Sequence, residues 1–325
     1  SLKSPPINQF QHNIMAEINP TDNHFVSSSE FYNFLQDSTA SKLVIDVRSH
    51  DKYLESCIRS SQNLTFTITP TTTRHLHITS ADDNVVACKK YAWDDKECSI
   101  KDSKDWNLRG VVYKWIFFID EQPTDQGITW NIINLLKEEK KVNSQCIKVL
   151  RDGFSSFAAD YPFLISSMNT KKRALDGILA SEIVPKFLYL GSYENASSMP
   201  QIKALGITHI LNMAGELENK FPNDGINYKK CGIDDHHTEN IATHFKDALD
   251  FIDNARAENP NNKVLVHCAM GISRSSAIVI AWVMQTYGWT FEASREWVKV
   301  KRPVIKPNEG FLAQLKEFDV YLQQT

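Results

Sequence analysis

The chain has 325 residues, and its 36 Lys and Arg residues and 39 Asp and Glu residues leave a formal net charge of −3. That balance excludes the strongly basic surface on which nucleic-acid binding depends, so we expect no nucleic-acid partner. Hydrophobic residues make up 42% and charged residues 23% of the chain, as in folded globular proteins. The length predicts two domains.

Targeting signals and cysteine usage indicate the compartment. No stretch approaches the roughly 18 consecutive apolar residues of a membrane span, and the opening sequence SLKSPPINQFQHN lacks the apolar run of a signal peptide. The six cysteines include no Cys-x-x-Cys pair, which argues against a disulfide scaffold and a structural zinc site. We therefore expect a soluble protein of the cytoplasm, with the nucleus as a further location and no membrane span.

Strands and helices alternate in the first half of the chain. A helix capped by Ser28 or Ser29 is expected to run through Leu35. Apolar runs predict three buried parallel strands, at residues 43–47, 111–119 and 146–150, with a helical pattern at 132–136 between the last two. This alternation predicts an open, mostly parallel sheet with helices on its faces.

The second half repeats this rhythm. Four short strands are expected, at residues 187–190, 208–211, 226–230 and 264–266. Helical spacing predicts a helix around residues 245–252, and three more helices are expected to begin near Arg274, Phe291 and Asn308. The predicted fold class is therefore α/β, with two domains that each have a central, mostly parallel sheet flanked by helices.

Segments without a regular pattern set the domain boundaries. Residues 1–22 are polar and contain three prolines, which predicts a mobile tail. The composition turns polar again at residues 166–180, which predicts a linker between a first domain at 23–165 and a second domain at 181–325. Residues 65–109 fit neither domain pattern and predict a long irregular insertion.

One junction between a strand and a helix is suited to chemistry. Residues 263–275, KVLVHCAMGISRS, place a buried strand before a short glycine-containing loop and a helix. Unpaired backbone N–H groups and the helix dipole make such a junction an anion site. Arg274, six residues after Cys268, would close that site with a planar guanidinium matched to phosphate oxygens.

Cys268 stands at the base of this loop. The field that binds a phosphate dianion also stabilises a thiolate, so we expect the pKa of Cys268 to fall well below the free value of about 8.5. The thiolate would then be a nucleophile near neutral pH. The alternative is a buried structural cysteine, which is the usual state of a free thiol. His, Gly, Arg and Ser at these positions around one cysteine are rare by chance, which favours the nucleophile.

These residues resemble the His-Cys-x5-Arg-Ser signature of cysteine-dependent protein phosphatases, and the surrounding sequence is similar to their dual-specificity branch. The resemblance covers residues 181–325 and includes VPKFLYLGS at 184–192, ITHILN at 207–212 and KPNEGF at 306–311. The Tyr-Gly-Trp turn at 287–289 is similar to slingshot and MAP kinase phosphatases. The resemblance implies hydrolysis of phosphotyrosine and of phosphoserine or phosphothreonine.

Cleavage of a phosphate ester also needs a proton for the departing oxygen. Asp234 and Asp235, in the loop sequence GIDDHHTEN, are the candidates for this acid. In the family, the acid is followed by a polar residue at the fifth place and an aliphatic residue at the sixth, and Asn240 and Ile241 fill these places after Asp235. Asp235 is therefore favoured, with Asp234 as the alternative.

The resemblance implies a role for each residue of the loop. The Cys268 thiolate attacks phosphorus, Asp235 protonates the leaving group and then activates water, and the Ser275 hydroxyl stabilises the departing sulfur. His267 and Asn308 are expected to support the loop, and Asn308 is equally well placed to cap the last helix. The phosphate oxygens are expected to be held by Ala269, Met270, Gly271, Ile272, Ser273 and Arg274.

We expect neither a metal ion nor a cofactor. His236 and His237 form a candidate metal pair, but the side chains of adjacent residues diverge, so a solvated loop is the favoured interpretation. A phosphocysteine route uses the thiolate as nucleophile and requires no metal.

Residues 23–165 resemble a rhodanese-like domain. The matching segments are LVIDVR at 43–48, YLESCI at 53–58, LRDGFSSF at 150–157 and Tyr-Pro at 161–162. A sulfurtransferase carries its cysteine after the strand that ends at Ile119, where this chain has Asp120, and the following EQPTDQG has neither Cys nor Arg. We therefore expect this domain to be catalytically inactive and to serve docking or regulation.

An inactive rhodanese-like domain joined to a phosphatase is the layout of MAP kinase phosphatases, in which a cluster of arginines docks the kinase. Only Arg59 and Arg74 fall in the corresponding region of this chain. Lys171-Lys172-Arg173 in the linker is a candidate substitute, although a solvated charged linker is the favoured interpretation. The expected partner is thus a phosphorylated protein substrate, with a MAP kinase suggested by the architecture.

Two other functions remain open at this point. The same fold serves phosphatases of lipids, glucans or RNA, but lipid phosphatases tend to carry lysines in the loop, and Ala269, Met270 and Ile272 are uncharged. The other alternative is a phosphate-binding interaction or scaffold protein with little turnover, which would have no need of the thiol.

Overall fold

The computed structural model describes residues 24–40, 42–59, 61–63, 93–94, 99–100, 114–123, 129–130, 133, 146–167 and 169–324. The expected tail, most of the expected insertion and most of the helical pattern at 132–136 lie outside the described residues. The chain groups into two compact units. The first consists of residues 1–31 and 40–176, and the second of residues 32–39 and 177–325.

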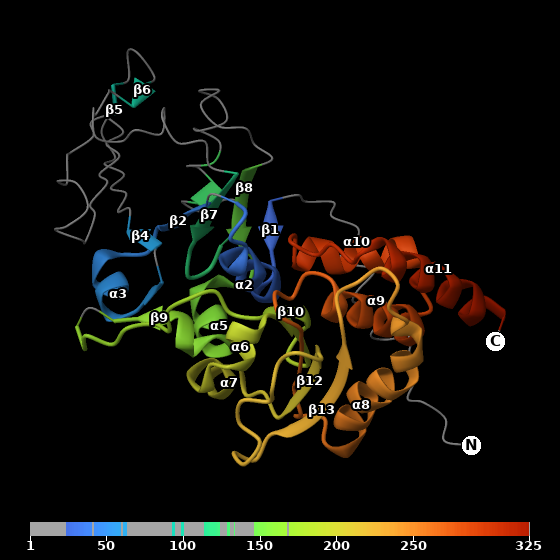
Figure 1. The fold of residues 1–325 in the computed structure, drawn as a ribbon. Coiled ribbons are helices and arrows are strands. Elements are labelled where there is room, and N and C mark those ends of the chain that lie inside the picture. Colours follow the sequence, from blue (N-terminus) through green and yellow to red (C-terminus); the bar gives the residue numbers. More distant parts are fainter. Residues whose placement is uncertain are drawn as a thin grey trace. The chain divides into compact units, whose positions relative to one another are not determined.

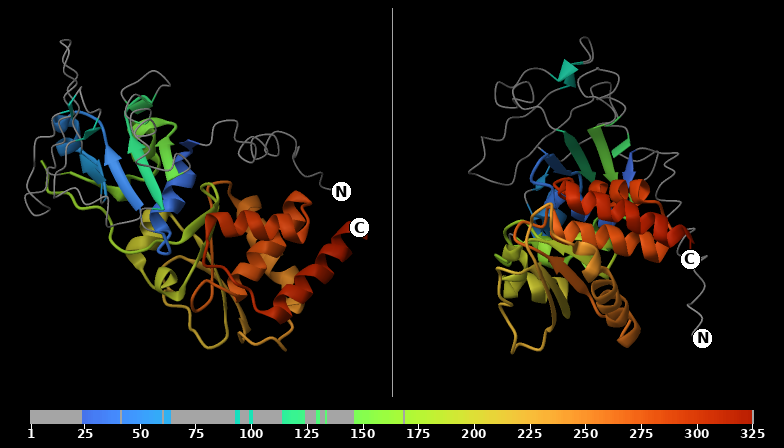
Figure 2. Two further views of the ribbon diagram at one scale, coloured as in Figure 1. Left: turned by 90° about the horizontal axis from the view of Figure 1, so that it is seen from above. Right: turned by 45° about the vertical axis from the view of Figure 1, so that its right-hand side comes forward.

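A parallel sheet forms the centre of the first unit. Its strand order is β1 (Phe25–Val26), β8 (Ile147–Leu150), β7 (Trp115–Ile119), β2 (Lys42–Asp46) and β4 (Ser61–Asn63), with every neighbouring pair parallel. Figure 2 shows the blue arrow of β2 beside the green arrows of β7 and β8. The strands predicted from apolar runs are present, with ends that differ by a few residues. Their side chains are largely buried because helices cover both faces of such a sheet.

The remaining elements up to residue 176 are short. They are α2 (Ser28–Gln36), α3 (His50–Glu55), α5 (Gly153–Asp160), the 3-10 helix η2 (Pro162–Leu164), β3 (Cys57–Ile58) with β9 (Ile165–Ser166), and β5 (Trp93–Asp94) with β6 (Ser99–Ile100). Helix α2 is divided between the units, because its residues from Tyr32 onward belong to the second unit. The start of α2 differs from the prediction. Ser27 caps this helix, because its hydroxyl accepts the Glu30 N–H at 3.3 Å while its own N–H donates to the Glu30 carboxylate at 2.7 Å.

The second unit has a five-stranded sheet. Its order is β10 (Ser181–Val184), β11 (Leu188–Gly191), β14 (Val264–His267), β12 (His209–Ala214) and β13 (Asn227–Ile233), and only the β10–β11 pair is antiparallel. The four predicted strands correspond to β11, β12, β13 and β14. The sequence pattern did not predict β10, in which the charged residue Glu182 is buried. The Glu182 carboxylate accepts hydrogen bonds from the Tyr189 hydroxyl and the Lys186 N–H, both at 2.8 Å.

Helices cover both faces of this sheet. They are α6 (Tyr193–Ala196), α7 (Met199–Leu205), the 3-10 helix η3 (Ile241–His244), α8 (Phe245–Glu258), α9 (Arg274–Tyr287), α10 (Phe291–Lys301) and α11 (Glu309–Gln324). Figure 1 shows α6 and α7 on one side of the sheet and α8 and α9 on the other. Helix α9 is buried over nearly its whole length, which fixes its first turn against the end of β14. Within the described residues, every helix is too short or too polar to cross a membrane.

Candidate active site

The predicted loop lies at the centre of the second sheet. Strand β14 pairs in parallel with β11 on one side and β12 on the other, and its last residue, His267, lies opposite Gly191 and Asn212. The chain then turns through residues 268–273 and enters α9 at Arg274. Because the carboxyl ends of parallel strands meet at one edge, this loop is placed where α/β sheets usually bind ligands.

Cys268 is buried beneath this loop, with 1% of its surface exposed. The Ser275 hydroxyl donates to its sulfur at 3.2 Å, and the backbone N–H groups of Ser275 and Gly271 also donate to it. Burial raises the pKa of Cys268, but these three donors and the charge of Arg274 outweigh it, so the pKa lies below its ordinary value. Such a thiol is readily ionised and therefore nucleophilic.

Arg274 has one buried donor left over for a ligand. Its Nη1 donates to the Glu216 carboxylate at 2.7 Å and to the Ile233 carbonyl at 3.0 Å. Its Nε is buried without a hydrogen-bond partner among the described residues. A buried unpaired donor is costly, and a phosphate oxygen would satisfy it. The guanidinium is thus held from behind by Glu216 and presents a free edge.

Sequence reasoning missed Glu216. It lies in the loop after β12. Strand β12 is parallel to β14, the strand that precedes Cys268, so the two strands end at the same edge of the sheet. The bond from Arg274 lowers the pKa of Glu216, so this carboxylate stays ionised and orients the guanidinium. An acidic residue just after a buried parallel strand was the available signal, but the sequence does not show which of several such residues meets the arginine.

Asp235 is the acidic candidate that contacts the loop. Its Oδ1 accepts the Ser273 hydroxyl at 2.6 Å and the Asn308 amide at 3.0 Å, and its Oδ2 lies 3.9 Å from Arg274 Nε. Its side chain is 39% exposed, so it is open to water. Asp234, in contrast, has no hydrogen-bond or ion-pair partner in the described part of the chain. The geometry therefore brings Asp235, and not Asp234, into contact with Ser273 of the loop and near Arg274.

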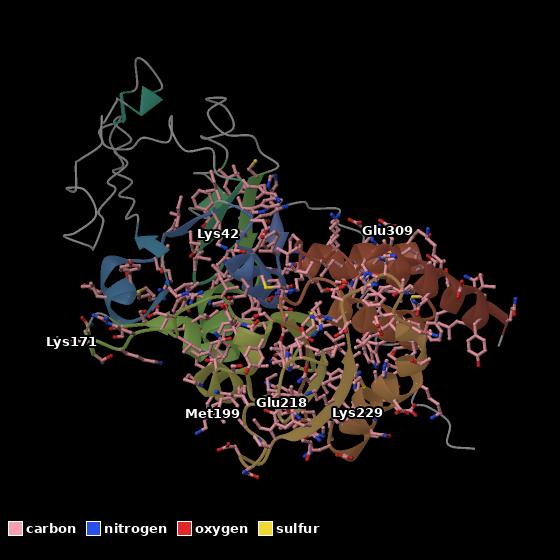
Figure 3. The ribbon with its side chains drawn as sticks, viewed as in Figure 1. Lys42, Lys171, Met199, Glu218, Lys229 and Glu309 are labelled. Atoms are coloured by element: carbon pink, nitrogen blue, oxygen red, sulfur yellow. The ribbon has the colours of Figure 1, made fainter. Side chains whose placement is uncertain are left out.

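Asn308 contacts the loop and also caps the last helix. Its backbone N–H donates to Ser273 Oγ at 3.1 Å and its amide donates to Asp235, while its Oδ1 accepts the N–H of Phe311 and so caps α11. Figure 3 labels Glu309, the first residue of that helix. The backbone N–H of Asn308 thus binds the loop at Ser273, and its side chain joins Asp235 to the last helix.

His267 and the remaining loop residues frame the site. His267 is buried, and its Nδ1 lies 3.2 Å from the Cys268 carbonyl oxygen. Burial lowers its pKa to about 4, so the imidazole is neutral at neutral pH. The carbonyls of Ala269 and Ile272 accept backbone N–H groups of Tyr193 at 3.0 Å and Lys306 at 2.8 Å. The Met270 side chain is 66% exposed.

The histidine pair that follows Asp235 is exposed to solvent. Both rings are exposed, and His236 Nδ1 lies 2.8 Å from the Thr238 hydroxyl oxygen. Within the described residues, no three His, Cys, Asp or Glu side chains are grouped so that they could hold a metal ion.

The strand, loop and helix around Cys268 are those of a dual-specificity protein phosphatase. Residues 188–320 match the family model described as "Dual specificity phosphatase, catalytic domain". Over 354 aligned residues the chain is 30% identical to the "Probable rhodanese domain-containing dual specificity protein phosphatase" of Dictyostelium discoideum, covering 95% of this chain and 72% of that protein. The chain therefore belongs to the rhodanese domain-containing dual-specificity phosphatases.

Other relatives match less than half of the chain. "Protein phosphatase Slingshot homolog 3" of Mus musculus is 42% identical over 139 residues, which cover 43% of this chain and 21% of that protein. The crystal structure of DUSP15 is 31% identical and covers 46% of this chain and 97% of its own, with a TM-score of 0.41. This chain thus spans about a fifth of the mouse Slingshot protein.

The first unit has no thiol at the position where a rhodanese carries one. Asp120 follows β7 directly, and its carboxylate accepts the Glu121 N–H at 2.7 Å and the Thr129 hydroxyl at 2.6 Å. Arg59 donates to the Leu175 carbonyl at 2.5 Å, whereas Arg74, the other arginine considered for docking, lies outside the described residues. Lys171, Lys172 and Arg173 are exposed.

Proposed function

We propose that this protein hydrolyses phosphotyrosine and phosphoserine or phosphothreonine in a protein substrate through a phosphocysteine on Cys268. The observation that carries the proposal is the buried thiol of Cys268, whose pKa lies below its ordinary value, six residues before Arg274. The Nε of Arg274 has no hydrogen-bond partner among the described residues and lies 3.9 Å from the Asp235 carboxylate. A nucleophile, an oxyanion donor and an acid meet in one place, which is what phosphate-ester cleavage requires.

In the first step, the Cys268 thiolate attacks phosphorus. A sulfur–phosphorus bond forms as the bond from phosphorus to the substrate oxygen breaks, and Asp235 gives its proton to that oxygen. Arg274 and the N–H groups of residues 269–274 hold the three remaining oxygens, whose charge they stabilise in the transition state. The dephosphorylated hydroxyl of the substrate then leaves.

In the second step, water attacks the phosphocysteine. Asp235, now ionised, takes a proton from the water as a new oxygen–phosphorus bond forms and the sulfur–phosphorus bond breaks. The departing sulfur carries away the electron pair as a thiolate, which the Ser275 hydroxyl stabilises from 3.2 Å. The bonds from Ser273 and Asn308 to Asp235 keep the carboxylate within reach of both steps.

We propose a phosphorylated MAP kinase as the substrate and the cytoplasm, together with the nucleus, as the location. The support is the architecture, a rhodanese-like unit joined to a dual-specificity phosphatase, which the Dictyostelium relative shares by its name. The uncharged Ala269, Met270 and Ile272 favour a protein substrate over a lipid. Arg59 is engaged with a backbone carbonyl, so the exposed Lys171, Lys172 and Arg173 are the better candidate contacts for an acidic kinase site.

The proposal is tested by hydrolysis of para-nitrophenyl phosphate across acidic and neutral pH. The wild type is compared with Cys268→Ser, Asp235→Ala and Asp234→Ala. Activity should vanish in Cys268→Ser, and only Asp235→Ala should lose the basic limb of the pH profile, because that limb reports the general acid. A wild type that binds phosphopeptides without turnover would instead make the chain an interaction protein.

A further inference from the structure

Arg302 lies behind the phosphate loop (residues 268–274), at the residue that follows α10. It is 9% exposed, and each of its guanidinium nitrogens donates a hydrogen bond. Its Nε donates to the Gly271 carbonyl at 2.8 Å, its Nη2 to the Met270 carbonyl at 3.3 Å and its Nη1 to Ser181 Oγ at 3.2 Å. Two of its three bonds therefore hold successive carbonyls of the loop.

These bonds determine where the loop N–H groups point. In a trans peptide the carbonyl and the N–H of one peptide group point in opposite directions. The Met270 carbonyl shares its peptide group with the Gly271 N–H, which donates to the sulfur of Cys268. A carbonyl held outward by Arg302 therefore turns this N–H inward. In the same way, the bond to the Gly271 carbonyl turns the N–H of Ile272 toward the phosphate position.

The loop has no space to relax away from Arg302. Gly271 has a φ of 69°, and a Cβ added there would lie 2.4 Å from the Gly191 carbonyl oxygen and 2.7 Å from Arg302 Nη2. Gly271 is thus packed between the end of β11 and the guanidinium. The chain after Arg302 continues the support, because the Lys306 N–H donates to the Ile272 carbonyl at 2.8 Å.

The charge of Arg302 also acts on the site. Among the described residues, no carboxylate lies within ion-pair distance of it, whereas Arg274 is paired with Glu216. Burial lowers the pKa of Arg302, and the charge of a Cys268 thiolate opposes that decrease. A buried cation needs a counter-charge, and here the thiolate or a bound phosphate supplies it.

We propose that Arg302 is a positioning residue of the phosphatase site, which orients the Met270 and Gly271 peptide groups and places a second fixed positive charge behind the phosphate loop. The inference rests on the proposed function. Arg302 acts through the loop and not by contact with the substrate. The inference therefore predicts effects of Arg302 substitutions on the ionisation of Cys268 and on phosphate binding as well as on turnover.

The test compares Arg302→Gln and Arg302→Lys with the wild type, and uses Lys299→Gln as the matched control because Lys299 is an exposed cation in the last turn of α10, the helix that Arg302 follows. The first readout is the pH dependence of Cys268 alkylation by iodoacetamide, with the modified peptide identified by mass spectrometry. The second is inhibition by inorganic phosphate, and the third is kcat and KM for para-nitrophenyl phosphate. Circular dichroism and thermal unfolding check the fold of each variant.

Arg302→Gln should shift alkylation of Cys268 to higher pH, weaken phosphate inhibition and lower kcat/KM by about 10- to 100-fold, the range for hydrogen bonds to charged groups. Arg302→Lys keeps the positive charge but cannot donate to both the Met270 and the Gly271 carbonyls as the planar guanidinium does. Cys268 should therefore ionise nearly as in the wild type, while inhibition by phosphate should be weaker than in the wild type. Lys299→Gln should match the wild type. If Arg302→Gln does not fold, Arg302→Lys is the test: its Cys268 should be alkylated with nearly the pH dependence of the wild type, while its inhibition by phosphate should be weaker.

A folded Arg302→Gln with wild-type alkylation and wild-type phosphate inhibition would overturn the inference. So would a variant that loses only thermal stability, because that result assigns Arg302 a purely structural role. If the wild type itself lacks turnover while Arg302→Gln still shifts the ionisation of Cys268, the proposed function fails and the positioning role stands.

Discussion

The thiol of Cys268 experiences two opposing effects of its surroundings. Burial raises its pKa, while the Ser275 hydroxyl, the backbone donors and Arg274 lower it further than burial raises it. The thiolate is the reactive form, so activity should rise with pH as Cys268 ionises and fall again once the acid has lost its proton. Single hydrogen bonds around the sulfur therefore control the ascending limb of the pH profile.

Ser275→Ala should move that limb to higher pH. The substitution removes the donor at 3.2 Å from the sulfur, which stabilises the thiolate both before attack and on its departure. The expected loss in kcat is about 10- to 100-fold, as for hydrogen bonds to charged groups. Steady-state kinetics together with the pH dependence of alkylation checks this. Ser294→Ala is the control, since the Ser294 hydroxyl is buried in α10 without a partner among the described residues; equal behaviour of the two variants would count against the role of Ser275.

His267 should make stability depend on pH. Its pKa is lowered by burial from 6.5 to about 4, so between these values the unfolded chain binds a proton that the folded protein does not. Stability is then complete above about pH 6.5 and decreases as pH falls toward 4, by roughly 3 kcal/mol in total. Urea unfolding at several pH values should show a steeper decrease for the wild type than for His267→Asn. The exposed His236→Asn should retain the wild-type slope, and parallel slopes for all three proteins would contradict the assignment.

Helix α11 contacts the acid loop, residues 234–240, which contains Asp235. Gln314 connects the two elements, because its amide donates to the Glu239 carbonyl at 2.8 Å and its Oε1 accepts the Ala242 N–H at 3.0 Å. Gly310 lies directly against the same loop, where a Cβ would come within 1.9 Å of the His237 carbonyl oxygen. The position of Asp235 thus depends on a helix that follows it by many residues in the chain.

Gly310→Ala should displace the acid loop without unfolding the protein. The added methyl group cannot coexist with the His237 carbonyl, so the loop or the helix must move and the bond from Asn308 to Asp235 should lengthen. We expect lower kcat and a weakened basic limb, with the ionisation of Cys268 unchanged. The control is Ala313→Ser, an exposed position on the same helix. A normal pH profile for Gly310→Ala would show that α11 does not position the acid.

Elements with continuous apolar runs could be predicted from the sequence, and those that depend on a polar contact could not. Strands β11, β12 and β14 were located to within a few residues because their buried runs are uninterrupted. Strand β13 was also located, although only Cys231 and Ile233 in it are buried. Strand β10 was missed because Glu182 breaks its pattern, and the cap of α2 was misplaced because Ser27 acts together with Glu30. In the site, fixed spacing identified Cys268 and Arg274. Glu216 and Arg302 reach the site through the fold, and no local spacing identifies them.

At the scale of the whole molecule, one chain carries two α/β units that place very different residues at comparable positions. The loop after β14 begins with Cys268, whereas the chain after β7 continues with Asp120, whose carboxylate is hydrogen-bonded to Glu121 and Thr129. A carboxylate cannot accept a sulfur atom as a persulfide. The catalytic chemistry of the chain is therefore expected in the second unit.

The full chain should have no thiosulfate sulfurtransferase activity. Transfer of sulfur to cyanide requires a thiol at the position of Asp120, and the carboxylate there cannot form a persulfide. The measurement is thiocyanate formation by the wild type and by Cys268→Ser. Thiocyanate formed by both proteins would show a second catalytic thiol and contradict the expectation.

The most direct measurement is the detection of a phosphoryl group on Cys268 during turnover. Asp235→Ala, in which hydrolysis of the intermediate should be slowest, is mixed with substrate, quenched within the first turnover and digested for mass spectrometry. The account predicts one phosphoryl group on the peptide that contains Cys268, and none in Cys268→Ser. Turnover that proceeds normally with no phosphoryl group on Cys268, or with one on another residue, would contradict it.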